Sequence, residues 1–332
     1  MRKYRSPRDR GLGRPPGVVD EKERVSLDRY RKATAGLTVS TILIAISVAM
    51  VSGVLIDSAG IALVAWLSAA LLVVACMWRS NHTRIADFLG TIGLIWSAAV
   101  GCGVIAMLSL RFHLPMADHL LFSLDHTLGF DGVAIAAWLV DQGQWIFSIM
   151  APAYALTIPL MVISMTALAL GGRRVEAWRA AFSFVGSLVT ICLIAISTPA
   201  KGLGVWAPPQ LLKHLPDGAM RYFWANFDRF YAGTKPVLSL ATIDGVISFP
   251  SLHAAMGFTT VAMWRKNWLC LAMALSWLTF MLLATFPYGG HYVVDVLAGI
   301  AVAAGWFALS RRIEAHPRST ATETAASAIQ GG

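Results

Sequence analysis

The sequence predicts an all-α membrane protein built as a bundle of about eight transmembrane helices. Of the 332 residues, 57% are hydrophobic and only 14% are charged, and the mean hydropathy is +0.63, values that soluble globular domains do not show. Several apolar runs reach the roughly 20 residues with which a helix crosses about 30 Å of hydrocarbon. The alternation of polar and apolar residues that marks membrane strands is absent from the sequence.

The first segment, residues 1–34, is rich in Arg, Lys, Pro and Gly and has little apolar surface. This composition predicts a disordered, basic, cytoplasmic tail. The apolar run that follows has full spanning length, so it resembles an uncleaved anchor and not a signal peptide. The tail charges are interpreted as topology determinants, and attraction to anionic lipid is the alternative.

Eight apolar segments are predicted to cross the membrane, with boundaries good to about 2 to 4 residues. They are residues 35–56, 59–77, 86–109, 146–170, 178–199, 251–264, 268–286 and 291–310. The chain then divides into the tail 1–34, N-terminal transmembrane helices in 35–199, a second part with an outer loop and further helices in 200–314, and a disordered cytoplasmic tail 315–332.

Charge distribution orients this arrangement. With the N-terminus in the cytoplasm, the inner tails and loops hold about 21 of the 27 Lys and Arg residues, the bias expected of cytoplasmic segments. We therefore predict a multi-pass protein of the cell's inner (plasma) membrane with both termini cytoplasmic. The net charge of +9 does not indicate nucleic-acid binding, because the basic residues lie in tails and short loops and not on one amphipathic face.

Two predicted outer segments are long. In 110–145, the apolar residues of the stretch 118–131 recur at helical spacing, which predicts a helix lying along the membrane surface. Its histidines and aspartates have none of the stronger metal-site spacings. The segment 200–248 is unusual for an outer loop because it collects positive charges, which solubility or a site for an anionic headgroup would explain: Lys201, Lys213, Arg221, Arg229 and Lys235.

Two ionisable motifs stand at the starts of the apolar segments 251–264 and 291–310, where such side chains need a partner or a function. Pro250 and Ser251 predict a helix start, with His253 in the first turn. One hairpin helix separates the two segments, so both begin on the same, outer face. Two helix N-termini side by side would suit a phosphate group.

The second motif combines a flexible turn with a histidine and an acid. Gly290 allows close approach of the backbone to a ligand just before His291. His291 and Asp295 are four residues apart and share a helical face, so the carboxylate can accept the Nδ1 proton and leave Nε2 free to act. Histidines that only stabilise helix packing, or a metal site made of two histidines and the aspartate, are the alternatives.

These motifs resemble those of the type 2 phosphatidic acid phosphatase (PAP2) superfamily, and more narrowly its inositolphosphotransferase-like branch. The second motif of the superfamily, Pro-Ser-Gly-His, is matched by residues 250–253 except at Leu252. The third motif ends in His-x-x-x-Asp, as His291 and Asp295 do. Phe-Pro-Ser-Leu-His and Gly-Gly-His-Tyr-x-x-Asp are similar to the branch, and the motifs cover about the last third of the chain.

The resemblance implies a PAP2-like helical core and a role for each motif residue. His291 would attack phosphorus and form a phosphohistidine, Asp295 would orient it, and His253 would act as general acid. Ser251 and Gly290 are the expected phosphate-binding residues of the motifs. No metal or other cofactor is implied.

The phosphate-binding cations depart from the family pattern. The third motif usually opens with Ser-Arg, where this chain has Ala284 and Thr285, and the first motif, a Lys followed by Arg-Pro, has no clean match. Arg229 and Lys235 are the nearest candidates for the missing phosphate clamp.

The expected function is therefore hydrolysis or transfer of a phosphoryl or phosphoinositol group on a phospholipid, a lipid phosphate or a polyprenyl pyrophosphate at the outer leaflet. The expected partners are the lipid substrate and the bilayer, not nucleic acid, and the oligomeric state is not predicted. A metal-dependent membrane hydrolase and a non-catalytic lipid-binding or transport protein remain the alternatives.

Overall fold

The structure, a computed structural model, describes residues 21–233, 237–240, 243 and 245–315. Helices dominate these residues, and the all-α membrane fold is confirmed. In chain order the helices are α1 (Glu21–Ser52), α2 (Ser58–Met77), α3 (Thr83–Ser109), α4 (Asp118–Thr127), α5 (Gly132–Asp141), α6 (Gln144–Ala155), α7 (Thr157–Leu170), α8 (Arg174–Ser197), α9 (Pro209–His214), α10 (Trp224–Tyr231), α11 (Leu252–Trp264), α12 (Trp268–Ala284) and α13 (Val293–Ala315). Shorter elements are the 3₁₀ turns η2 (Leu110–Phe112) and η3 (Leu203–Val205), the π-helical turn η5 (Thr285–Gly289), and the parallel strands β1 (Leu55–Ile56) and β2 (Val237–Leu238).

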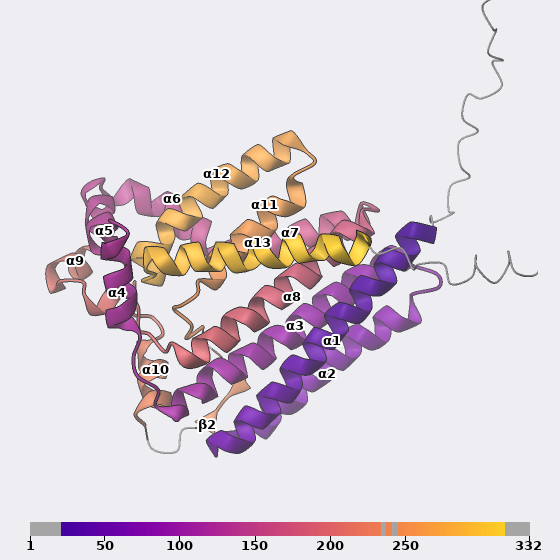
Figure 1. The fold of residues 1–332 in the computed structure, drawn as a ribbon, viewed down its shortest axis with the longest axis horizontal. Helices are drawn as coiled ribbons and strands as arrows, with labels where there is room; N and C mark the ends of the chain where they lie inside the picture. Colours follow the sequence, from indigo (N-terminus) through magenta and orange to yellow (C-terminus); the bar gives the residue numbers. More distant parts are fainter. Residues whose placement is uncertain (1–20, 234–236, 241–242, 244, 316–332) are drawn as a thin grey trace, which may run out of the picture.

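The long helices lie alongside one another and give the bundle two distinct ends (Figure 1). One end, here called the terminal end, holds the start of α1, the end of α13 and the turns joining α2 to α3, α7 to α8 and α11 to α12. The opposite end gathers the short helices α4, α5, α9 and α10. Helices α3 and α8 form the centre, since 67% and 61% of their most apolar stretches are buried.

Six helices are long and apolar enough to cross a membrane, or up to eight if each of two bent helix pairs counts as one span. The predicted span 146–170 is one of these pairs, because α6 and α7 meet at 49° just after Pro152, a residue that removes a helical hydrogen bond. The predicted span 251–264 is α11, whose 13 residues cover only about 20 Å at 1.5 Å per residue. It therefore does not meet the length test for a full crossing.

The second bent pair is the predicted surface helix in 110–145, which divides into α4 and α5 at an angle of 77°. Asp131 caps α5 by accepting a hydrogen bond from Ala134 N at 2.9 Å. On α4, Leu121 is only 1% exposed and belongs to an apolar cluster that also contains residues of α5, α6 and η3. Through Leu121, α4 therefore packs against the other short elements at the opposite end of the bundle.

The prediction of a disordered tail over residues 1–34 is wrong for residues 21–34, which are helical in α1; residues 1–20 and 316–332 lie outside the described part of the chain. Glu21 and Glu23 favour the helix start electrostatically. Leu27 and Tyr30 are buried, and the Tyr30 hydroxyl donates to Ser310 O on α13 at 2.8 Å. Composition misled the prediction because Tyr30 and Arg31 find their partners on helices far away in the sequence.

A buried ionic cluster provides that neutralisation at the terminal end. Asp87 on α3, 1% exposed, accepts hydrogen bonds from Arg31 on α1, from Arg174 on α8 and from Trp178 Nε1 at 2.8 Å. A carboxylate buried among apolar helices is tolerated only with such partners. The cluster joins α1, α3 and α8 through charged residues that lie more than 50 positions apart in the sequence.

This cluster yields a stability prediction. Asp87→Ala leaves Arg31 and Arg174 without the carboxylate that they share, so we expect the free energy of unfolding in detergent to fall by about 3–5 kcal/mol. Asp28→Ala is the matched control: it removes another acidic partner of Arg31, but one whose side chain is 51% exposed, and should cost less than about 1 kcal/mol. Equal effects of the two substitutions would contradict the assignment.

Candidate active site

The first side of the site is the start of α11. Ser251 is fully buried, and its Oγ accepts a hydrogen bond from Ala254 N at 3.4 Å, which caps the helix as predicted. Its backbone N–H donates to Asp295 O on α13 at 2.9 Å. The beginnings of α11 and α13 are thus joined directly, which brings the two sequence motifs together.

The second side is the turn between α12 and α13. Gly290 adopts φ +65°, a left-handed conformation that favours glycine, and His291 N donates to Thr285 O at 3.1 Å. A Cβ added at Gly289 would stand 2.7 Å from His291 Cδ2 and 2.9 Å from the Tyr154 hydroxyl. The two glycines therefore make the turn possible and leave the space that the imidazole of His291 occupies.

His291 is held at both ring nitrogens. Its Nδ1 lies 3.3 Å from Asp295 Oδ2, and its Nε2 lies 3.3 Å from Ser251 Oγ. With Nδ1–H donating to the carboxylate, Nε2 carries a lone pair and Ser251 donates to it. The imidazole is 4% exposed and its ring centroid lies 6.4 Å from that of His253. The structure therefore brings together His253, His291, Asp295 and Ser251, four of the motif residues singled out in the sequence.

Asp295, like Ser251, has no exposed surface. Besides His291, its Oδ2 accepts hydrogen bonds from Tyr292 N at 2.9 Å and from Ser248 Oγ at 3.1 Å. Its Oδ1 has no hydrogen-bond partner within the described residues. Ser248 could not be predicted from the sequence, because it is a serine in an irregular segment with no local pattern around it.

Tyr154, contributed by α6, is another site residue that sequence analysis missed. Its ring stacks on His253 at a centroid distance of 4.1 Å and an angle of 17°, and its hydroxyl lies 3.2 Å from His253 Nδ1. A hydroxyl that donates to Nδ1 leaves the Nε2 of His253 as the protonated nitrogen of the neutral ring. A single tyrosine in an apolar run, 99 residues from its partner, gives no sequence signal.

The helix N-termini are less open than the sequence suggested. Asp125 on α4 accepts hydrogen bonds from Val293 N and Val294 N, both at 2.8 Å, so its carboxylate already occupies the N-terminus of α13. At α11, by contrast, no acceptor for the Leu252 and His253 N–H groups occurs in the described part of the chain. The idea of two free helix ends facing a phosphate is therefore wrong for α13 and stands for α11.

A second carboxylate of α4 holds the neighbouring loop. Asp118 accepts hydrogen bonds from Lys201 N at 3.0 Å, from Gly202 N at 2.7 Å and from the Tyr292 hydroxyl at 3.0 Å. Burial raises the pKa of the Tyr292 phenol, which therefore stays protonated and able to donate.

The acidic face of α4 could have been recognised from the spacing of its aspartates in the sequence. Asp118 and Asp125 are seven residues apart, so they lie on one helical face together with the buried Leu121. In the sequence these aspartates were considered only as metal ligands, and their capping role was missed. Among the described residues, no group of three or more His, Cys, Asp or Glu side chains is placed to hold a metal ion.

The candidate phosphate-binding residues differ in how they are placed relative to the histidine site. Arg229 on α10 is exposed, and within the described residues no hydrogen bond or ion pair joins it to the histidines; Lys235 lies outside the described residues. Gly290 packs on protein backbone, since its carbonyl accepts Leu203 N at 2.6 Å. Lys201 lies beside Gly202, where an added Cβ would approach the Gly290 carbonyl, and its Nζ pairs with Asp228 at 2.6 Å. Lys201 is therefore the candidate cation whose contacts, within the described residues, come nearest to the turn that carries His291.

Comparison with known proteins adds one finding. A family model described as PAP2 superfamily matches residues 119–309, which is more than half of the chain. The matched range runs from α4 into α13 and contains both histidines and Asp295. No curated protein and no solved structure matches the chain.

The cap on α13 can be tested without an activity assay. In Asp125→Asn, an amide N–H₂ replaces one acceptor and faces a backbone N–H, so we expect a loss of about 1–3 kcal/mol in the free energy of unfolding. Asp131→Asn is the matched control, because asparagine caps a helix as well as aspartate does. Thermal unfolding of both variants in detergent measures the difference, and an unchanged stability of Asp125→Asn would refute the cap.

Proposed function

Because the chain belongs to the PAP2 superfamily, whose members are membrane phosphatases and phosphotransferases, we propose that it cleaves a phosphoester or pyrophosphate bond of a lipid through a covalent phosphohistidine at His291. The observation that carries the proposal is the setting of His291. Asp295 holds Nδ1, and Nε2 points to the start of α11, where Ser251 and His253 stand. A histidine with one nitrogen oriented by a buried carboxylate is suited to nucleophilic attack through the other.

In the first step, His291 Nε2 attacks the phosphorus atom. The N–P bond forms as the bond from phosphorus to the leaving lipid oxygen breaks, and His253 donates a proton to that oxygen. The acid form of His253 is its imidazolium, which the negative charge of a bound phosphate favours. The contact of Asp295 with Nδ1 stabilises the positive charge that develops on His291.

In the second step, neutral His253 removes a proton from an incoming water molecule or alcohol. The oxygen attacks phosphorus, the N–P bond breaks, and the electron pair returns to His291 Nε2. Water gives hydrolysis, whereas an alcohol gives transfer. The same two histidines serve both outcomes.

Phosphoryl charge needs donors placed before the reaction begins. The side chain of Ser251 and the N–H groups of Leu252 and His253 at the start of α11 are suited to this task. Arg229, Lys235 and Gly290 remain proposed phosphate-binding residues. Lys201 joins them, because its backbone is fixed by Asp118 next to the His291 turn.

The short α11 supports a lipid substrate. Because this helix cannot cross the hydrocarbon by itself, one of its ends lies below the headgroup level, and a lipid phosphate can reach the site without leaving the membrane. Charge bias supports an active site on the periplasmic or extracellular face of the plasma membrane, with both termini cytoplasmic. Labelling of a cysteine placed at position 214 by a membrane-impermeant reagent added from outside tests the orientation.

The residues at the variable positions of the two motifs support a finer assignment to the inositolphosphotransferase-like branch. Leu252 between Ser251 and His253, and Tyr292 after His291, are the residues that favour it over the wider superfamily. In this assignment the lipid alcohol of the donor leaves in the first step, His291 carries a phosphoinositol or similar headgroup, and a second lipid alcohol is the incoming nucleophile that accepts it. Adding such an acceptor to an assay with an inositol phospholipid should divert the product from free inositol phosphate to the new lipid ester.

Removal of the nucleophile is the first activity prediction. His291→Ala should lower the release of phosphate from a panel of lipid phosphates in detergent by about 10³-fold or more. His214→Ala, which removes an exposed histidine on α9, is the matched control and should keep wild-type activity. Activity that persists in His291→Ala would exclude the phosphohistidine route.

The same assay in excess EDTA separates the proposal from the metal-dependent hydrolase. The phosphohistidine route is expected to keep its rate, whereas a metal-dependent hydrolase would lose it. A non-catalytic lipid-binding protein would release no phosphate in either condition and would bind lipid equally well after His291→Ala.

Tyr154 gives a sharper prediction about positioning. Tyr154→Phe keeps the ring stacked on His253 but removes the hydroxyl that meets Nδ1, so we expect kcat to fall by about tenfold with little change in stability. Tyr288→Phe is the control, because Tyr288 belongs to the same aromatic stack while its hydroxyl contacts Phe147 O. Equal kcat values for the two variants would remove Tyr154 from the mechanism.

A further inference from the structure

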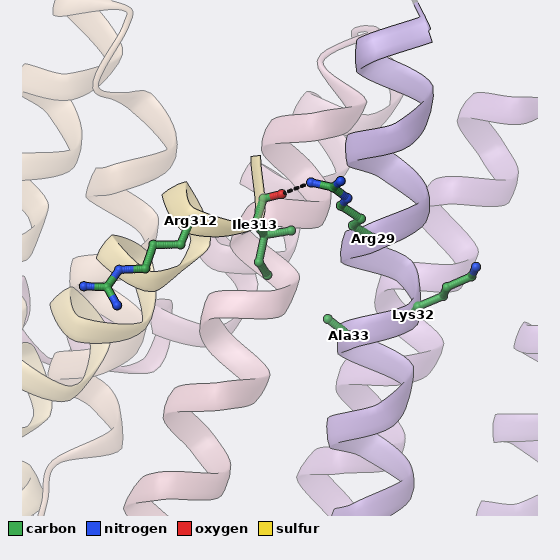
Figure 2. A pocket seen from close by; sticks show the side chains of 5 residues that line it. All are labelled: Arg29, Lys32, Ala33, Arg312 and Ile313. Carbon is green, nitrogen blue, oxygen red and sulfur yellow. Dashed lines mark hydrogen bonds between the residues drawn. The ribbon is translucent and has the colours of Figure 1, made fainter. Parts of the chain in front are cut away.

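Two hollows lie beside α1, and they differ in what they offer to a ligand. At the terminal end, a depression between α1 and α13 is lined by Arg29, Lys32, Ala33, Arg312 and Ile313 (Figure 2). Arg29 donates to Ile313 O at 2.9 Å, and Figure 2 shows Lys32 and Arg312 pointing away from each other. The cations of this depression therefore do not converge on a common ligand.

The second hollow, here called the groove, has walls from α1 and α2 and a floor from α3. Its volume is about 380 Å³, within the range of roughly 300–1,000 Å³ that is typical of ligand pockets. The walls include Ala49 of α1 and Ala65 of α2, and the floor includes Ser97 and Val104 of α3. None of the lining residues belongs to α11, α12 or α13, so the groove is separate from the histidine site.

Two close approaches to α3 explain why a groove forms. A Cβ added at Gly101 would lie 3.1 Å from Thr41 Cγ2 on α1, and one added at Gly93 would lie 3.1 Å from Leu72 Cδ2 on α2. These glycines are eight residues apart, so they point about 80° away from each other around the axis of α3. The two helices therefore pack on different faces of α3, and Ser97 lies between those faces.

The lining of the groove offers a ligand almost nothing but apolar contact. Among the described residues that line it, only Ser68 and Ser97 have polar side chains, and none is charged. Ser97 Oγ donates to Gly93 O of its own helix at 2.7 Å. A ligand of the groove is therefore a hydrocarbon and not a headgroup, because a polar group placed there would lose its hydrogen bonds to water.

The position of the groove indicates where such a hydrocarbon comes from. All three of its helices are long and apolar enough to cross a membrane, and Met50 and Ile61 at its rim are 80% and 46% exposed. Ile56 of β1 and Leu240 also line it, and they belong to the end of the bundle opposite the terminal end. At this depth in a bilayer the surrounding molecules are acyl chains.

We propose that the groove holds one acyl chain of a bilayer phospholipid, whose headgroup stays outside the groove at the membrane surface. The chain would lie on α3 between α1 and α2 and fill a space that the protein's own side chains leave open. Filling it supplies dispersion contacts that an empty groove would lack. A lipid that binds only the folded chain also stabilises the fold, and this site does not depend on the reaction proposed for His291.

Native mass spectrometry of the full chain, delipidated in detergent and then loaded with one lipid at a time, tests the proposal. The wild-type protein should retain one dipalmitoylphosphatidylcholine molecule and should retain dipalmitoylphosphatidylglycerol equally well, because no charge lines the groove. It should not retain dihexanoylphosphatidylcholine, whose chains are too short to fill the space. Ala65→Phe places a ring in the groove and should lower retention of the dipalmitoyl lipids by about tenfold.

The matched control is Ala62→Phe, the same substitution at an exposed position of α2 that does not line the groove. It should retain the lipid as the wild-type protein does. Ala49→Phe fills the groove from the side of α1 and should reproduce the loss, so the result does not depend on the folding of one variant.

Several results would overturn the proposal. Wild-type retention in both groove variants would place the lipid elsewhere, and an equal loss in Ala62→Phe would show general contact with lipid. Preference for phosphatidylglycerol, or equal retention of the dihexanoyl lipid, would show recognition of a headgroup. A lipid-free dimer that Ala65→Phe converts to monomer would show that a second copy of the chain covers the groove.

Discussion

The fully buried carboxylate of Asp295 is the constraint on which the site depends. A charge with no exposed surface at the start of a membrane helix is tolerated only with several hydrogen-bond donors around it, and here the donors come from separate parts of the chain. Ser248 precedes α11, the Tyr292 N–H belongs to the entry of α13, and His291 Nδ1 completes the set. The Asp295 carbonyl adds the bond from Ser251 N. One residue thereby fixes both helix starts and the orientation of the imidazole.

Around this centre, buried carboxylates connect the helices at two further places. On the site side, α4 inserts Asp125 and Asp118 into the backbone of the neighbouring segments, so that the entry to α13 and the loop at Lys201 share one support. At the other end, Asp87 joins α1, α3 and α8 through buried ion pairs. Both supports consist of carboxylates that accept hydrogen bonds from donors distant in sequence. Such polar contacts orient helices in lipid, where the hydrophobic effect does not drive helices together.

How much of this arrangement the sequence predicted depends on how far apart in the chain the interacting residues lie. Apolar runs and the four-residue spacing of His291 and Asp295 are local patterns, and they predicted the helical membrane fold, most spans and the pairing of these two residues. The polar start of α1 was missed because Tyr30 is buried against α13 and Arg31 pairs with Asp87 on α3, partners that lie far away in the sequence. The stacking of Tyr154 on His253 was missed for the same reason. The candidate cations for phosphate lie in loops and short helices, whose geometry composition alone does not specify.

The central claim is that His291 becomes phosphorylated. The most direct measurement is a rapid quench of the wild-type protein and of His253→Ala after mixing with a ³²P-labelled aryl phosphate, whose leaving group needs no acid. Label on the peptide containing His291, stable in alkali, released in acid and longer-lived in His253→Ala, is the predicted result, because removing the base slows the second step. Product formation with no labelled protein at any quench time, in both proteins, would contradict the account.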